Sequence, residues 1–148
     1  MAWTASGLYY PTHRDVYDTT QLAIDLDLET HKGALYDSVE TPNYTTETAY
    51  SATNEITGTN WAAGGVALTG TAVDESPTGT LRWDATDVSV ATTTITTDPE
   101  GIKYYADALA GNNLIVGIDF PAGDYTTSAG TFGITFASTG VLTIDLTP

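Results

Sequence analysis

Every second residue is apolar along Leu114-Ile115-Val116-Gly117-Ile118-Asp119-Phe120, and this stretch decides the fold class. A period of two turns one set of side chains toward a core, as in a β-strand. The same period recurs at residues 131–136 and 142–146, each after a short turn sequence rich in glycine, proline or serine. The three segments predict a three-stranded antiparallel meander, with Gly140 in the left-handed conformation of a hairpin turn.

The composition also favours strands over helices. Threonine accounts for 29 of the 148 residues, and Thr and Tyr are enriched in strands, whereas the helix-forming Lys, Glu and Leu are scarce. We predict an all-β fold, an antiparallel β-sandwich or jelly-roll-like single domain over residues 21–148. Further strands are expected at residues 33–37, 50–57, 66–73, 81–84, 88–97 and 101–106, with a bulge or bend near residues 92–94.

Residues 1–20 are expected to form an extended N-terminal arm. Alternation over residues 22–28 favours an extended segment there too, although Thr12 is also suited to cap a short helix. Aromatic side chains on an arm need a partner surface, or else they fold back over the protein's own core. The candidate interface residues are Trp3, Tyr9, Tyr10 and Arg14.

The charge excludes several classes of function. The chain has 19 Asp and Glu against 4 Lys and Arg, a formal net charge of -15, and no cysteine. So few basic residues give no electrostatic source for binding nucleic acid or an anionic membrane, and the lack of cysteine excludes disulfides and thiol chemistry. No secretion signal or membrane span is recognisable, so we expect a soluble protein made in a cytoplasm.

The acidic residues and histidines point to no catalytic, cofactor or metal site. Asp25, Asp27 and Glu29 share one strand face and are of the type that binds a hard cation, but a solvated face is the commoner meaning of such a pattern. His13-Arg14-Asp15 matches a kinase catalytic loop only in its letters, since no glycine-rich loop precedes it. We therefore expect no enzyme and no cofactor.

A family resemblance emerges from residues 53–70. Their order of an Asn-Glu pair, a glycine, an aromatic residue and a Gly-Gly pair resembles a signature of small structural proteins of tailed-bacteriophage virions. Residues 30–36, 101–105, 114–120 and 128–136 are similar to other strands of that family, and the resemblance spans about residues 20–148. The residues that carry the signature are Asn54, Glu55, Gly58, Trp61, Gly64 and Gly65.

Within this family the chain is most similar to the capsid decoration, or cement, proteins. The resemblance implies a homotrimer that binds the major capsid protein on the outer surface of the phage head, after synthesis in the bacterial cytoplasm. It also implies structural roles for the signature: Trp61 as a core residue and Glu55 as an acceptor for backbone N–H groups in its loop. Gly33 departs from the family pattern and predicts a bulge or a close backbone approach.

Two alternatives belong to other classes of protein. The first is a tail-associated or host-surface module that binds carbohydrate on an aromatic platform built from Trp61, Trp83 or the Tyr104-Tyr105 pair. The second is a small β-sandwich hydrolase, and the lack of a recognisable base and nucleophile pair makes it the weakest of the three.

Overall fold

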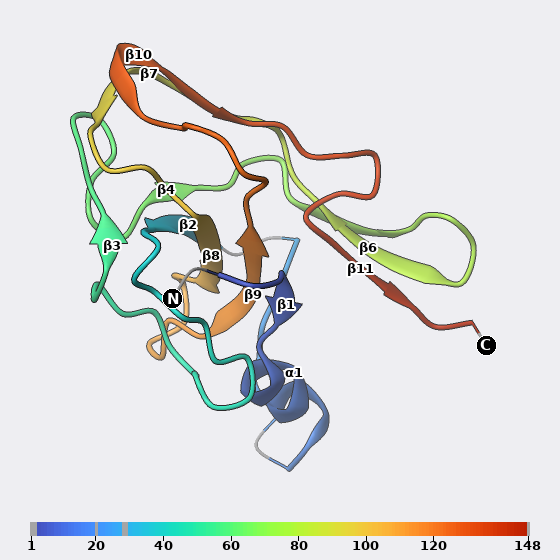
Figure 1. Cartoon of the computed structure of the whole chain (residues 1–148). Helices are drawn as coiled ribbons and strands as arrows, with labels where there is room; N and C mark the ends of the chain where they lie inside the picture. The colour runs from blue at the N-terminus through green and yellow to red at the C-terminus, as the bar shows by residue number, and fades with distance from the viewer. Residues whose placement is uncertain (1–2, 20, 28–29, 148) are drawn as a thin grey trace.

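The computed structural model describes residues 3–19, 21–27 and 30–147 and is built mostly from antiparallel strands, with one short helix in these residues. Figure 1 shows their arrangement. The elements, in chain order, are β1 (Gly7–Leu8), α1 (Tyr10–Tyr17), β2 (His31–Tyr36), β3 (Glu55–Ile56), β4 (Val66–Ala67), β5 (Ala72–Glu75), β6 (Thr80–Asp84), β7 (Val88–Ile95), β8 (Gly101–Ala106), β9 (Leu114–Asp119), β10 (Thr127–Ile134) and β11 (Leu142–Asp145).

A central sheet runs in the order β1-β9-β8-β2-β3, and β4 also pairs with β2. All six residues of β8 are buried because a separate apolar cluster covers each face of the sheet. Ile102 and Tyr104 face the larger cluster, which includes Trp61 and Trp83. Tyr105 faces the smaller, aromatic cluster.

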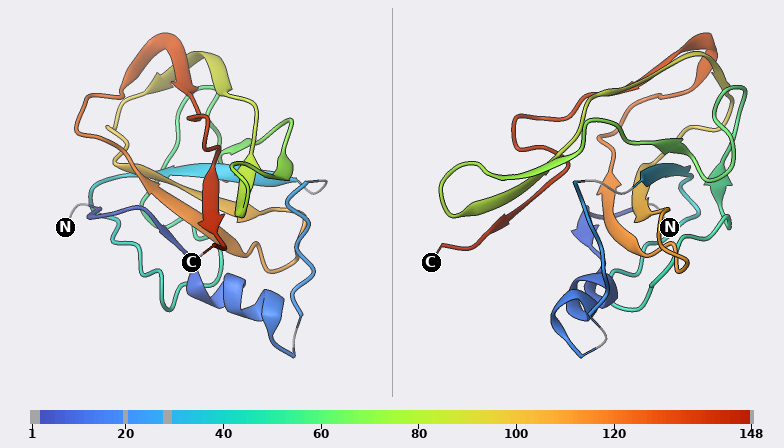
Figure 2. Two further views of the ribbon diagram at one scale, coloured as in Figure 1. Left: turned by 90° about the vertical axis from the view of Figure 1, so that its right-hand side faces the viewer. Right: turned by 180° about the vertical axis from the view of Figure 1, so that it is seen from behind.

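The other strands form two smaller sheets. β7 pairs with β10, and β6 lies between β5 and β11 in a three-stranded sheet that projects away from the central sheet (Figures 1 and 2). The bulge expected near residues 92–94 is confirmed: the β7–β10 register shifts on both sides of the Gly130–Thr93 pair. Thr92 has a φ of 58°, which reverses the alternation of the strand at that point.

The predicted three-stranded meander is wrong. β9 pairs with β1 and β8, β10 pairs with β7, and β11 pairs with β6. A period of two fixes which face a side chain occupies but not which strand lies beside it, so the pattern carries no information on partners. The predicted turn is nevertheless present, because Gly140 has a φ of 74° and its N–H donates to the Ala137 carbonyl.

Three other strand predictions also need correction. Of residues 50–57, only Glu55–Ile56 form a strand. The 66–73 segment divides into β4 and the start of β5. Residues 22–27 are not a strand, and residues 28 and 29 lie outside the described residues.

Within residues 3–19, the prediction of an extended arm is also wrong; residues 1, 2 and 20 lie outside the described residues. β1 adds to the edge of β9, and α1 follows at once. Pro11 sits in the first turn of α1, where its fixed φ suits the helix and its missing N–H costs nothing; Thr12 lies inside the helix rather than capping it. Trp3 and Tyr9 are 5% and 0% exposed, because the segment folds back over the aromatic face of the central sheet. Among residues 3–19, 21–27 and 30–147, no helix has the length and apolar character that a membrane crossing needs.

Candidate functional site

Glu55 accepts a backbone hydrogen bond across the signature loop, the role that the resemblance implies. One carboxylate oxygen, Oε1, accepts a hydrogen bond from the Gly64 N–H at 2.7 Å, and Oε2 accepts one from the Tyr50 hydroxyl at 2.6 Å. Burial, followed by the hydrogen bond to Glu55, raises the pKa of Tyr50 to about 12. The loop therefore keeps Tyr50 neutral and uses Glu55 as a structural acceptor.

The glycines of the loop are required by close backbone contacts. Gly64 and Gly65 have φ values of 86° and 72°, which disfavour residues with a Cβ atom. A Cβ on Gly65 would lie 1.8 Å from the Gly33 carbonyl oxygen, and one on Gly58 would lie 2.2 Å from the Thr94 carbonyl oxygen. Gly33 itself pairs regularly with β4 and β8 and marks a close approach to the Tyr104 ring, not a bulge.

The aromatic residues proposed as a carbohydrate platform lie in the interior. Trp61 is 0% exposed and packs edge-on against Phe132 with ring centroids 5.1 Å apart, which confirms its predicted role in the core. Trp83 and Tyr104 are equally buried, and Tyr105 is 2% exposed. None of these four rings is available on the surface for a sugar.

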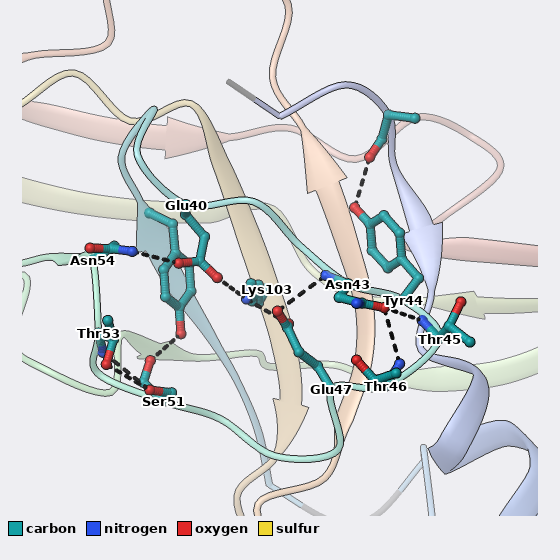
Figure 3. Close-up of polar contacts among 12 residues, drawn as sticks. Glu40, Asn43, Tyr44, Thr45, Thr46, Glu47, Ser51, Thr53, Asn54 and Lys103 are labelled. Carbon is teal, nitrogen blue, oxygen red and sulfur yellow. Dashed lines mark hydrogen bonds and ion pairs between the residues drawn. The ribbon is translucent and has the colours of Figure 1, made fainter. Parts of the chain in front are cut away.

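A buried ionic cluster joins β8 to Asn54 of the signature and to Glu40 and Glu47 (Figure 3). Lys103, on β8, is 4% exposed, and its Nζ contacts Glu40 Oε1 at 2.5 Å and Glu47 Oε2 at 2.8 Å. Asn54 of the signature donates from Nδ2 to the other oxygen of Glu40 at 2.9 Å. Two carboxylates thus compensate one buried ammonium, which is the condition for burying such a charge at tolerable cost.

The same lysine lies against aromatic rings. Its Nζ is 4.7 Å from the ring centroid of Tyr36 and 5.9 Å from that of Tyr9. Burial is the largest cause of the raised pKa of both tyrosines, so they stay neutral at ordinary pH. The ammonium and both carboxylates have partners inside the chain, so the cluster acts as a structural link between β8 and residues 40–54.

The candidate interface residues divide into two groups. Trp3 and Tyr9 are in the core, whereas Tyr10 is 56% exposed on α1. Arg14, also on α1, contacts Asp15 at 2.6 Å and lies 5.8 Å from the Tyr10 ring centroid. Of the four predicted interface residues, only Tyr10 and Arg14, both on α1, therefore lie on the surface.

The acidic segment at residues 25–29 has its own structural partners. Asp25 accepts a hydrogen bond from the Asp27 N–H, and Asp27 accepts one from the Val73 N–H of β5; Glu29 lies outside the described residues. His13 contacts the Ile115 carbonyl oxygen at 3.1 Å through Nε2. In residues 3–19, 21–27 and 30–147, no group of three or more His, Cys, Asp or Glu residues is placed to hold a metal ion.

Sequence reasoning missed a groove between α1 and the projecting sheet. A cavity of about 350 Å³ lies there, lined by Val16 and Tyr17 of α1, Ile24 and Leu26 of the next segment, and Leu81 and Ile144 of the projecting sheet. These residues come from four separate parts of the chain, so no local pattern predicts the cavity. The one available signal was that β6 and β11 each place apolar residues on a single face.

A comparison of the chain with family models, curated proteins and solved structures finds no match. The resemblance to phage structural proteins therefore stays a prediction, and the function that it implies is a proposal.

Proposed function

We propose that the chain is a non-enzymatic structural protein of a bacteriophage virion, a capsid decoration protein with a β-sandwich domain that binds the outside of the head lattice and stabilises it. One observation carries the proposal: the residues that resemble the family signature form a single interlocked loop. Glu55 accepts a hydrogen bond across the loop from the Gly64 N–H, and Trp61, within the loop, is fully buried. These are the structural roles that the resemblance implies.

The open sheets support an assembly of several copies, which we propose to be a homotrimer. β5 and β11 are the edges of the projecting sheet, and unpaired strand edges need a cover. Association of identical subunits is one means of providing it, and a closed symmetric ring limits the assembly to a fixed size.

The charge supports a separate partner of opposite sign, which we propose to be the major capsid protein. Each of the four basic residues forms an ion pair inside the chain, so the surface presents mainly carboxylates. A net charge of -15 keeps many copies soluble before they assemble and draws them toward basic surfaces.

Purified phage heads that lack the protein provide the test. We expect added protein to appear as trimeric density on the outer head surface and to raise the temperature at which the heads open. Light scattering that reports a monomer both free and on heads would contradict the trimer. Density confined to the tail would contradict the head location and favour the tail-associated alternative.

A further inference from the structure

The projecting sheet has one apolar face, which looks toward α1. In the register of the sheet, Leu81 of β6 lies opposite Glu75 of β5 and Ile144 of β11, and Trp83 lies opposite Val73 and Leu142. Residues paired across antiparallel strands point to the same side. The other face carries the polar residues Asp74, Arg82 and Thr143.

Burial along this face decreases from the base of the sheet to its tip. At the base, Trp83 is 0% exposed and its Nε1 donates to the Leu26 carbonyl oxygen at 2.9 Å. In the middle, Leu81 and Ile144 are half-buried and line the cavity described above. At the tip, Leu146 is 69% exposed beside a second hollow lined by Val73, Glu75 and Leu81. The face is therefore an apolar groove that the chain itself fills only at one end.

Carboxylates border the groove along its length. Asp25 and Asp27 line the cavity, and Glu75 lines the hollow at the tip. Lys103, Lys32 and Arg82 are held in ion pairs with Glu40, Asp107 and Asp74. Two copies joined groove to groove would place these carboxylates against each other, and like charges placed together oppose binding.

We propose that this groove docks a segment of a different protein that combines apolar side chains with lysine or arginine. The apolar side chains would fill the hollows beside Leu81 and Leu146, and the cations would lie against Asp27 and Glu75. Placing this groove at the contact with the phage head rests on the proposed decoration function. Its recognition of a basic, apolar segment does not.

A pair of short peptides tests the recognition directly. The probe is the peptide Lys-Val-Lys-Val-Lys-Leu, and the control is Glu-Val-Glu-Val-Glu-Leu. Methyl NMR spectra of the full chain should show shifts at Leu81, Ile144 and Leu146 with the basic peptide only, and the shifts should weaken as salt is added. No shift at these methyl groups, or equal shifts with both peptides, overturns the proposal.

Two matched variants locate the binding on the apolar face. Leu146→Asn removes an exposed apolar side chain, so the fold should tolerate it, and it should weaken binding of the basic peptide about tenfold because one leucine is no longer buried. Thr143→Asn on the opposite face of β11 should leave binding unchanged. If Leu146→Asn and Thr143→Asn bind the basic peptide with equal affinity, the proposal is overturned.

Photo-crosslinking to purified heads separates this inference from the decoration function. A crosslinking amino acid in place of Leu146 should capture capsid protein, whereas one in place of Thr143 should not. Capture of capsid protein only from position 143 overturns the docking face but leaves the decoration function standing. Capture of a second copy of the chain from position 146 also overturns the docking proposal. Peptide binding without any binding to heads supports the groove and counts against the decoration function.

Discussion

Replacing Lys103 with methionine tests the energetic weight of the buried ionic cluster. Methionine keeps most of the apolar stem and removes the ammonium, which leaves Glu40 and Glu47 near each other without their cation. The Glu40 side chain is only 12% exposed and that of Glu47 28%, so water compensates the first poorly and the second in part. Breaking a buried pair costs about 3–5 kcal/mol, and partial exposure of Glu47 places the expected loss near the lower value, about 3 kcal/mol.

A loss of this size is easily measured. At about 3 °C per kcal/mol for a chain of this length, Lys103→Met should lower the melting temperature by about 9 °C, and urea unfolding should report the same free energy. The matched control is Lys32→Met, whose ion pair with Asp107 is 3.0 Å long but joins side chains that are 34% and 31% exposed. Its removal should cost at most about 1 kcal/mol.

A third variant decides whether uncompensated charge is the cause. Adding Glu40→Gln and Glu47→Gln to Lys103→Met removes both orphaned carboxylates and should recover a large part of the lost stability. The reasoning is refuted if Lys103→Met costs no more than Lys32→Met, or if the triple variant is less stable than Lys103→Met alone.

The signature loop and its neighbours yield three further predictions. Gly65→Ala should lower the free energy of unfolding in urea by about 3 kcal/mol, because the φ of 72° disfavours alanine and the new Cβ would meet the Gly33 carbonyl. Gly130→Ala is the control and should change stability little, since the atom nearest to its Cβ would be 3.7 Å away. Equal losses of stability in the two variants would contradict this prediction. Glu55→Gln leaves one oxygen for two donors and should cost about 1–2 kcal/mol in the same assay; an unchanged midpoint would show that neither bond matters. The pKa of Tyr50 rises from about 10 in the unfolded chain to about 12 in the fold, so the contribution of neutral Tyr50 to folding stability is complete below pH 10 and is lost as the pH rises through 12. Tyrosinate absorbance and the melting temperature should both change within this range of pH. Ionisation of Tyr50 near pH 10 without loss of structure would contradict the prediction.

Local patterns predicted the elements that local forces determine. The strand expected at residues 101–106 matches β8, and the bulge or bend expected near residues 92–94 matches the bulge at Thr92. Glu55 and the glycines were predictable because tight loops need acceptors and left-handed residues within a few positions of each other.

The features that depend on distant residues were not predictable in the same way. The meander failed because each strand has more than one compatible neighbour, and the sequence alone does not say which of them is nearest. The prediction of an extended arm failed because the aromatic residues of this segment cover the face of β8 that carries Lys103 and Tyr105. That face exists only once the central sheet has formed. The groove could not be predicted for the same reason, because its walls come from separate parts of the chain that meet only in the folded protein.

The long separation between β6 and β11 in the chain has a consequence for synthesis. β5 and β6 are joined by a four-residue turn and can pair as soon as they leave the ribosome, whereas β11 follows β6 by roughly sixty residues. Until β11 has been synthesised, one edge of β6 is unpaired beside the apolar side chains of Leu81 and Trp83. A product that stops before Leu142 keeps this edge permanently, so it can recruit strands from other unfinished chains. Synthesis of β11 therefore separates a chain with a covered β6 edge from one that is prone to aggregate.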